Sequence, residues 1–457
     1  MPLSAIVTDG GKAFQPNANT MLFPHAFYSC RDAPFSKCSL QAQQESWTNQ
    51  FGTSGLENVY AVATLGDHIV VAGFTAGSLD GNSNAGFWDI FVTKLDSSGS
   101  KIWTFQIGSA SSELARAVQI ESSTGNIVVV GYTWGTLNGA NAGNTDVFVV
   151  KIDNVGSHMW TMQTGTSNDD DLRAVQIDSS GNIIAGGDTR GALSGFSNPN
   201  PGSRDIIVLK LDSSGSTQWT FQTGSLSNEY VYDLKLDASN DIVLAGATWG
   251  QLGSSSNAGD SDIYVMKLNN AGSSQWVFQT GTTGSDQGKH LGIDSSGNIL
   301  VGGWTNGDLG NTNQGSTDIF VMQLNSAGAQ QWTFQTGTEG VDYIKGLAIG
   351  TFNIILGGTT TSAWHGSCNR GGEDLFIMEL DSDGSSVQKI FQTGSSSADT
   401  LEGLVLNADE AVILAGYSYG DLGGSNAGSG DAFVMKVPKG IEWDQGGLYS
   451  GCWMFEK

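Results

Sequence analysis

The stretch KLDSSGSTQWTFQTG, residues 210–224, recurs along the chain with few changes, and related copies begin at Lys94, Lys151, Lys267 and Gln323. Its DSSGS segment fits a hairpin turn, because Gly supplies a positive φ and Asp bonds its own backbone. A phrase that returns at a nearly fixed interval predicts an architecture of repeated units.

Two markers set the register of the repeat. The first is a Trp that begins a W-x-x-Q-x-G segment, at Trp47, Trp103, Trp160, Trp219, Trp276 and Trp332, with Lys389 in the seventh place. The second is an Asp before an apolar run such as IFVTKL, at Asp89, Asp146, Asp205, Asp262, Asp318, Asp374 and Asp431. Together they define seven units.

Each unit holds four strand-like runs, which we name A to D from the inside outward. In the second unit they are ARAVQI, NIVVVGYT, DVFVVKI and HMWTMQTG, rich in β-branched and aromatic residues. Four antiparallel strands repeated seven times predict an all-β protein, a seven-bladed β-propeller. A linear solenoid would need atypical capping units at both ends, and the sequence has none.

Ring closure follows from the order of the runs. The seventh unit lacks its strand D, whereas the segment around Trp47 precedes the first strand A. We therefore expect this N-terminal segment to be the outer strand of blade 7, which removes the open edge of the ring. The resulting domains are an N-terminal extension (1–46), the propeller (47–437) and a C-terminal tail (438–457). Both flanks are rich in aromatic residues and are expected to dock on the propeller or on a partner.

Charge narrows the range of partners. The chain has 45 acidic and 20 basic residues, a formal charge of −25. Such a polyanion repels nucleic acid and anionic lipid, so neither is an expected partner. No apolar run reaches the length of a transmembrane helix, so membrane insertion is not expected. Cations, neutral sugars and basic protein surfaces remain, and solubility alone would also explain the charge.

The repeat G-Y-T-x-G-x-L-x-G-x-x-N-A-G-x-x-D-x-F-V-x-K-L-D resembles the SBBP-type β-propeller repeat over all seven units. That family is known mostly from large surface or secreted proteins, which implies an extracellular or cell-surface location. No secretory signal is visible at the N-terminus, which leaves the cytoplasm open. LDSSGSTQW is also similar to the tryptophan-docking segment of pyrroloquinoline-quinone dehydrogenases, but these resemble eight-bladed propellers and often carry adjacent cysteines.

Seven acidic residues recur at the start of strand A, where we expect the mouth of a central channel: Glu57, Glu113, Asp170, Glu229, Asp286, Asp342 and Asp399. Three residues after them stand Tyr60, Arg116, Arg173, Tyr232, Lys289, Lys345 and Glu402. Six of these can donate to a carboxylate, so one interpretation is a set of local pairs that tie the D–A loops. The other is a cation-attracting ring, most open where Asp399 faces Glu402.

Metal and disulfide sites are further candidates. The strictly repeated Asp before strand C either caps a turn or belongs to a Ca²⁺ site. Only the first unit supports calcium, where DGNSNAG offers Asp80, Asn82 and Asn84, because the other units replace Asp80 by uncharged residues. The candidates for disulfides are Cys30, Cys38, Cys368 and Cys452. Their even number permits pairing and does not fix it.

One position after strand B varies freely between units: Ala76, Trp134, Arg190, Trp249, Asn306, Thr361 and Tyr419. A variable position on a constant scaffold is where specificity is expected. We therefore predict a ligand-binding rim at the D–A and B–C loops, formed by Trp134, Arg190, Trp249, Tyr419 and, in the irregular loop of blade 6, Trp364. The alternative is that these aromatic residues only cover the edge of the next blade.

The sequence shows no Ser-His-Asp set, phosphate-binding Gly loop or paired-His motif. No catalytic residues and no cofactor are therefore expected. The predicted function is a non-catalytic scaffold or binding module for a protein or a glycan, within a surface or larger assembly. The alternative is a propeller enzyme, either a glycan hydrolase that uses propeller carboxylates or a quinoprotein-like dehydrogenase.

Overall fold

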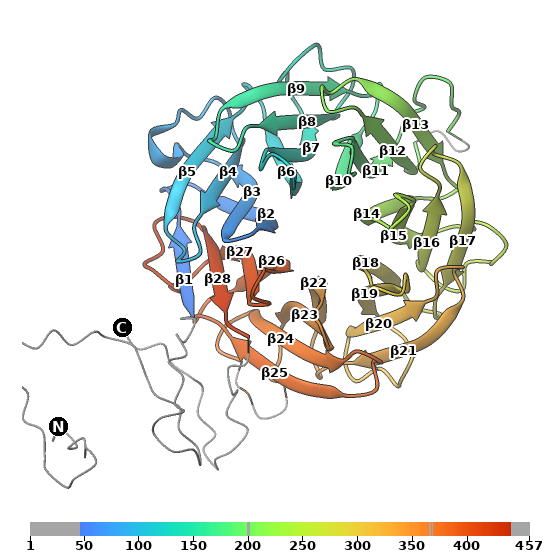
Figure 1. Cartoon of the computed structure of the whole chain (residues 1–457). Coiled ribbons are helices and arrows are strands. Elements are labelled where there is room, and N and C mark those ends of the chain that lie inside the picture. The colour runs from blue at the N-terminus through green and yellow to red at the C-terminus, as the bar shows by residue number, and fades with distance from the viewer. Residues whose placement is uncertain (1–45, 199–201, 365–366, 368, 440–457) are drawn as a thin grey trace, which may run out of the picture. The chain divides into compact units, whose positions relative to one another are not determined.

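The computed structural model describes residues 46–198, 202–364, 367 and 369–439. These residues form seven four-stranded antiparallel sheets arranged around one axis (Figure 1), which confirms the predicted seven-bladed propeller. Among the described residues outside the sheets, a short 3₁₀ turn forms η2 (Leu79–Gly81). Within the described residues, no helix has the length and apolar character that crossing a membrane requires.

The two inner strands of each blade follow the predicted order. Strand A is β2 (Glu57–Leu65), β6 (Glu113–Ile120), β10 (Asp170–Ile177), β14 (Glu229–Leu236), β18 (Asp286–Ile293), β22 (Asp342–Ile349) and β26 (Asp399–Leu406). Strand B is β3 (His68–Thr75), β7 (Ile127–Thr133), β11 (Ile183–Thr189), β15 (Ile242–Thr248), β19 (Ile299–Thr305), β23 (Asn353–Thr360) and β27 (Val412–Ser418).

The two outer strands carry both sequence markers. Strand C is β4 (Asp89–Leu95), β8 (Asp146–Ile152), β12 (Asp205–Leu211), β16 (Asp262–Leu268), β20 (Asp318–Leu324), β24 (Asp374–Asp381) and β28 (Asp431–Val437). Strand D is β5 (Lys101–Ile107), β9 (His158–Thr164), β13 (Thr217–Thr223), β17 (Ser274–Thr280), β21 (Gln330–Thr336), β25 (Val387–Thr393) and, for blade 7, β1 (Trp47–Phe51).

Ring closure occurs as the sequence predicts. Strand β1 pairs antiparallel with β28, and the register places Trp47 opposite Lys436 and Phe51 opposite Ala432. The first described strand thus completes the blade that the last strand leaves unfinished. Because every sheet then has four strands, the closure removes the unpaired edge that β28 would otherwise present.

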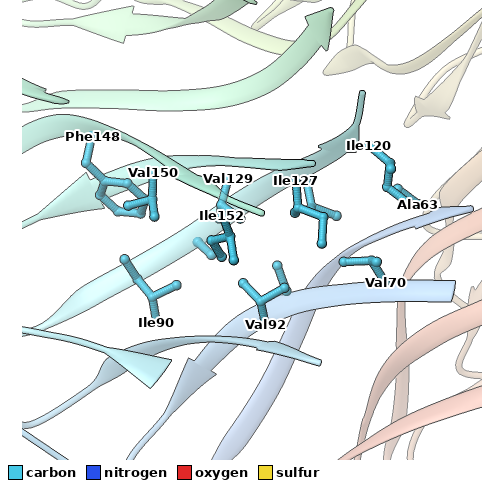
Figure 2. Close-up of a cluster of buried hydrophobic side chains, with 13 residues drawn as sticks. Ala63, Val70, Ile90, Val92, Ile120, Ile127, Val129, Phe148, Val150 and Ile152 are labelled. Carbon is cyan, nitrogen blue, oxygen red and sulfur yellow. The ribbon is translucent and has the colours of Figure 1, made fainter. Parts of the chain in front are cut away.

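The apolar core lies between neighbouring blades. Strands B and C are buried on both faces, which explains their nearly continuous Val, Ile and Leu runs. Figure 2 shows the cluster between blades 1 and 2, where Ile90 and Val92 meet Val129, Phe148 and Val150. Each blade therefore contributes one apolar face to each of its two neighbours.

The repeated Trp joins each blade to the next. The Trp of strand D packs its ring against a Gly in the C–D turn of the following blade, so close that a Cβ on Gly99 would lie 2.7 Å from the ring of Trp47. The contacts are Trp47 with Gly99, Trp103 with Gly156, Trp160 with Gly215, Trp219 with Gly272, Trp276 with Gly328, and Trp332 with Gly384. The Trp is thus a wedge between neighbouring blades at six interfaces.

This contact predicts a difference between two glycines that have the same backbone conformation. Gly99 and Gly297 both have φ of 81°, so Ala at either position costs about 1 kcal/mol of backbone strain. Only at Gly99 would the new methyl also displace an indole, since at Gly297 the nearest heavy atom lies 3.9 Å away. We expect Gly99→Ala to lower the free energy of unfolding by about 1–3 kcal/mol more than Gly297→Ala.

Chemical denaturation of the two variants measures this difference. Equal losses of stability in Gly99→Ala and Gly297→Ala would contradict the claim that Trp47 packs tightly on Gly99. Backbone strain would then explain the whole effect.

Candidate functional site

The B–C and D–A loops lie together on one face of the ring. The backbone of Glu113 donates to the carbonyl of Trp88 at 2.8 Å, and Trp88 and Ser112 form a parallel bridge between neighbouring blades. Equivalent bridges join Thr145 to Asp169 and other pairs around the ring. We call this the loop face, and the opposite face, made of the A–B and C–D turns, the turn face.

On the loop face, the repeated Gln of strand D holds the start of each B–C loop. In blade 1, Gln106 Oε1 accepts from the Leu79 N–H at 3.1 Å, while Nε2 donates to the carbonyl of Gly77 and to Asp89, each at 3.0 Å. The same role falls to Gln50, Gln163, Gln222, Gln279, Gln335 and Gln392. This side chain is therefore committed to the fold.

The repeated Asp of strand C caps the end of the same loop. Asp89 is buried and accepts from the N–H groups of Ala85 at 2.9 Å and Gly86 at 3.3 Å. Corresponding loop N–H groups donate to Asp146, Asp262, Asp318, Asp374 and Asp431. These contacts agree with the turn-capping interpretation of the sequence.

The repeated acid of strand A ties the D–A loop. Glu57 accepts from the Thr53 N–H at 2.6 Å, from the Thr53 hydroxyl at 2.8 Å and from the Thr75 hydroxyl at 2.6 Å. All seven such residues are buried: Glu57, Glu113, Asp170, Glu229, Asp286, Asp342 and Asp399. Their interpretation as an open, cation-attracting ring is therefore wrong, because each carboxylate faces hydroxyl and N–H donors inside its own loop.

The side chains three positions after these acids, from Tyr60 in blade 1 to Glu402 in blade 7, do not form the local pairs with them that the sequence suggested. They interact with one another across neighbouring inner strands, since Lys345 donates to Glu402 at 3.0 Å and Lys289 lies 3.2 Å from the centre of the Tyr232 ring. Glu402 therefore has a cationic partner, contrary to the expectation for blade 7. Burial lowers the pKa of Lys289 well below its usual value, and the nearby Arg173 adds to the shift.

Blade 3 contains a buried charge network. Arg173 bridges Asp171 at 2.6 Å and Asp188 at 2.9 Å, and Arg204 also contacts Asp188. The guanidinium groups of both arginines lie over the Tyr230 ring, 5.5 and 5.4 Å from its centre. The signal in the sequence was a departure from the repeat, because the positions of Asp171 and Asp188 are uncharged in every other blade. The network stabilises the inner end of the loop face at this blade.

The candidate Ca²⁺ residues have partners of their own. Asp80, in the 3₁₀ turn, forms an ion pair with Lys101. The Asn82 amide donates to the carbonyl of Leu79 at 2.9 Å, and the Asn84 side chain accepts from Gly86 at 3.1 Å. Over the described ranges, no group of three or more His, Cys, Asp or Glu side chains is placed to hold a metal ion. The calcium site stays a prediction, as do the disulfides, because Cys30, Cys38, Cys368 and Cys452 lie outside the described residues.

The predicted rim residues divide into exposed and buried ones. Trp134 is 42% exposed and Tyr419 is 45% exposed, while Trp249 and Arg190 are half-buried. Each aromatic side chain rests edge-on against a Tyr of an inner strand, as in the pair Trp134–Tyr132, whose ring centres are 4.9 Å apart. About two fifths of the surface of Trp134 and of Tyr419 is thus open to solvent on the loop face.

The placement of Trp364 on this rim is wrong. Trp364 is only 4% exposed and packs on Phe376, with 5.3 Å between the ring centres. Its backbone N–H donates to Gln392 as that of Leu79 does to Gln106. Trp364 therefore replaces the core leucine of the other B–C loops and does not reach solvent.

Sequence reasoning missed several exposed apolar residues of the loop face. Phe87 is 76% exposed in the B–C loop of blade 1, and Leu226 is 73% exposed in the D–A loop that leads into blade 4. Phe196, in the long B–C loop of blade 3, is 36% exposed. The available signal was an apolar residue inside a Gly- and Ser-rich loop, where burial is not required.

Comparison with known proteins identifies the repeat. Residues 275–311, which run from strand D of blade 4 into the B–C loop of blade 5, match the β-propeller repeat family SBBP. The chain carries an SBBP repeat. The predicted resemblance is confirmed by this match together with the seven blades.

Relatives of the chain are distant. The chain is 26% identical over 175 residues to the regulatory protein FlaEY of Caulobacter vibrioides. This match covers 34% of the chain and 18% of FlaEY. The chain is 23% identical over 205 residues to the uncharacterized WD repeat-containing protein L264 of Acanthamoeba polyphaga mimivirus, with 15% of that protein and 38% of this chain covered. The chain thus spans less than a fifth of the length of these curated relatives.

Among solved structures, the Pan2 WD40 domain of Neurospora crassa matches with a TM-score of 0.47 at 11% identity, covering 84% of this chain and 90% of that domain.

The raised pKa of a carboxyl group in strand A predicts how the free energy of unfolding depends on pH. Burial raises the pKa of Asp170 to about 6, above the ordinary value of 3.8, and the negative charge of Asp146 adds to the shift. The folded state therefore binds this proton more tightly than the unfolded chain. The resulting stability is complete below pH about 4 and is lost as the pH rises through about 6, on the order of 3 kcal/mol for Asp170 alone.

Denaturant unfolding between pH 4 and pH 7 measures this loss, and Asp170→Asn should flatten the decline. Asp212→Asn is the control, because hydrogen bonds from Ser214 lower the pKa of this exposed turn residue and its titration falls below the window. An identical slope for the wild type and for Asp170→Asn would contradict the assignment.

Proposed function

We propose that the chain is a non-catalytic binding module that holds a partner protein on its loop face. The observation that carries the proposal is that the repeated residues and the variable residues of each blade have different roles. The repeated Gln of strand D, the repeated Asp of strand C and the acidic residue (Glu or Asp) of strand A are engaged in hydrogen bonds that hold the loops, as in blade 1. Exposed apolar residues gather where the repeat varies, at Phe87, Trp134, Phe196, Leu226 and Tyr419. The names of the two relatives, a regulatory protein and a WD-repeat protein, are compatible with this role.

The surface suits a protein ligand for two reasons. Exposed Phe, Trp, Tyr and Leu side chains are the usual anchors of protein interfaces, because they bury much apolar area at a small cost in conformational entropy. The formal charge of −25 favours association with a basic partner. We place this partner within a surface or larger assembly and propose that binding needs no cofactor.

A glycan is the second candidate, favoured by a hollow on the loop face of blade 5. The hollow has a volume of about 520 Å³, and Thr282, Thr283, Asn306 and Asn313 are among its lining residues. Hydroxyl and amide groups of this kind match the hydroxyl groups of a sugar. Hydrolysis is not part of this proposal, and the engagement of the seven strand-A carboxylates within their loops supports leaving it out.

The proposal predicts that binding resides in the exposed aromatic rings of the loop face. Arrays of overlapping basic and apolar peptides, and a glycan array, are the probes. We expect the double variant Trp134→Ala/Tyr419→Ala to weaken binding to retained peptides at least tenfold, the equivalent of about 1.4 kcal/mol. Its thermal stability should change little, because neither side chain belongs to the buried core between the blades.

Phe352→Ala is the matched control, since Phe352 is an aromatic residue that is 82% exposed on the turn face. Loss of binding in this control, or full binding by the double variant, would overturn the proposal. Binding to glycans alone would favour the second candidate, and turnover of a bound glycan would establish the enzyme alternative.

A further inference from the structure

Every strand A has a β-bulge at the same position of the repeat, so one of its residues has no partner in strand B. In blade 5, the pairing passes from Gly288 to His290 and skips Lys289. Bulges redirect side chains and are common next to functional sites. Because the strands A surround the centre of the propeller (Figure 1), the bulges bring one side chain of each blade together there. We call these seven residues the axial ring: Tyr60, Arg116, Arg173, Tyr232, Lys289, Lys345 and Glu402.

Contacts between neighbouring blades show that members of the axial ring lie side by side. The guanidinium group of Arg116 lies 5.1 Å from the centre of the Tyr60 ring, and Lys345 donates to Glu402 at 3.0 Å. The exposed fraction of the side chain is 20% for Arg173 and 28% for Lys345. Solvent therefore reaches the axial ring, although its residues belong to the innermost strands.

The axial ring is basic, whereas the whole chain has a formal charge of −25. Its charged members are four cations and a single carboxylate: Arg116, Arg173, Lys289, Lys345 and Glu402. Asp171 and Asp188 contribute two further carboxylates beside Arg173, and Arg204 contributes another cation beside Asp188. In this group, five cations thus face three carboxylates when Lys289 is protonated, which leaves two positive charges uncompensated.

Lys289 is the cation of the axial ring that most lacks an acidic partner. Its ammonium group lies 3.2 Å from the centre of the Tyr232 ring, and within the described part of the chain no oxygen atom accepts a hydrogen bond from it. Burial is the main cause of its lowered pKa, to which the charges of Arg173 and Lys345 add, whereas Glu402 opposes the shift. An anion beside Lys289 would favour the protonated form.

The carboxylate of Asp233, on the neighbouring strand β14, is committed elsewhere. It accepts from the Lys235 ammonium group at 3.0 Å and from the backbone N–H of Leu291 at 2.8 Å. Its negative charge is therefore already balanced by Lys235 and does not supply the partner that Lys289 lacks.

We propose that the axial ring binds a small oxyanion of the phosphate class, held by Lys289 and Lys345 beside the positive charge of Arg173. An ammonium group has three N–H donors, and Lys345 uses one of them on Glu402. Charge-assisted hydrogen bonds from Lys to phosphate oxygens are strong, and a dianion balances two positive charges. The bound anion would join the inner strands of blades 5 and 6. This site goes beyond the proposed partner binding, which uses other residues on the loop face.

Titration calorimetry of the full chain with inorganic phosphate, at neutral pH and constant ionic strength, tests the proposal. We expect one saturable site in the wild type and about tenfold weaker binding by Lys289→Met, because the variant loses a charged donor. Lys101→Met is the matched control, since it removes the same charge from the outer strand β5 and should leave the affinity unchanged. No binding to the wild type, or an equal loss in the control, would overturn the proposal.

The variant Lys289→Met should keep its fold, because Met retains an apolar contact with Tyr232 and removes a partly buried charge. Denaturant unfolding of the variant checks this point.

A second variant tests the location with the opposite sign. Glu402→Gln removes the carboxylate that competes with the anion for Lys345, so we expect phosphate to bind about threefold more tightly. Unchanged or weaker binding by Glu402→Gln would contradict a site beside Lys345.

Discussion

The hydrogen bonds between β1 and β28 are the constraint on which the rest of the ring depends. A propeller blade is stable only when its neighbours cover both of its apolar faces, so a break at one interface exposes two blades. Pairing the first strand of the ring with the last one closes this break without a separate capping element. The indole of Trp47, delivered by the same strand, then wedges against blade 1 and makes the closure part of the regular pattern.

The repeat separates the residues that hold the fold from the positions that we propose for recognition. The Trp and Gln of strand D, the Asp of strand C and the acidic residue of strand A contact neighbouring blades and loops. The Gln, Asp and acidic side chains are therefore already hydrogen-bonded within the propeller. The positions that vary between blades do not have this structural role, and they carry the exposed aromatic rings of the loop face. A scaffold built in this way can change its partner by changing its loops while its core stays the same.

Most of the fold could be predicted from the sequence, because Trp and Asp recur in strict register and a missing strand D at one end matches a spare one at the other. The site was less predictable. Glu57 and its equivalents are satisfied by ordinary Thr and Ser hydroxyls, such as Thr75 at the end of the next strand, and spacing alone does not reveal such partners. Trp364 sits in a loop that departs from the repeat, so its equivalence to a core leucine appeared only from its hydrogen bond to Gln392.

Blade 3 illustrates a second limit. The charged residues Asp171, Arg173 and Asp188 stand out in the repeat, but their mutual contacts depend on which side chains meet across paired inner strands. For Phe87 the sequence signal is weaker, an apolar residue in a Gly- and Ser-rich loop, and only the structure shows that its side chain is exposed. The packing between blades could thus be predicted from the periodicity of the sequence. The contacts of the loop face depend on side-chain geometry, which only the structure shows.

Native-state hydrogen exchange of β1 tests the closed ring most directly. If the propeller is one cooperative structure sealed by this strand, the amides of β1 that bond to β28 should exchange with nearly the same free energy as those between β27 and β28. Exchange of β1 through a separate, low-energy opening, while the rest of blade 7 stays protected, would contradict the account.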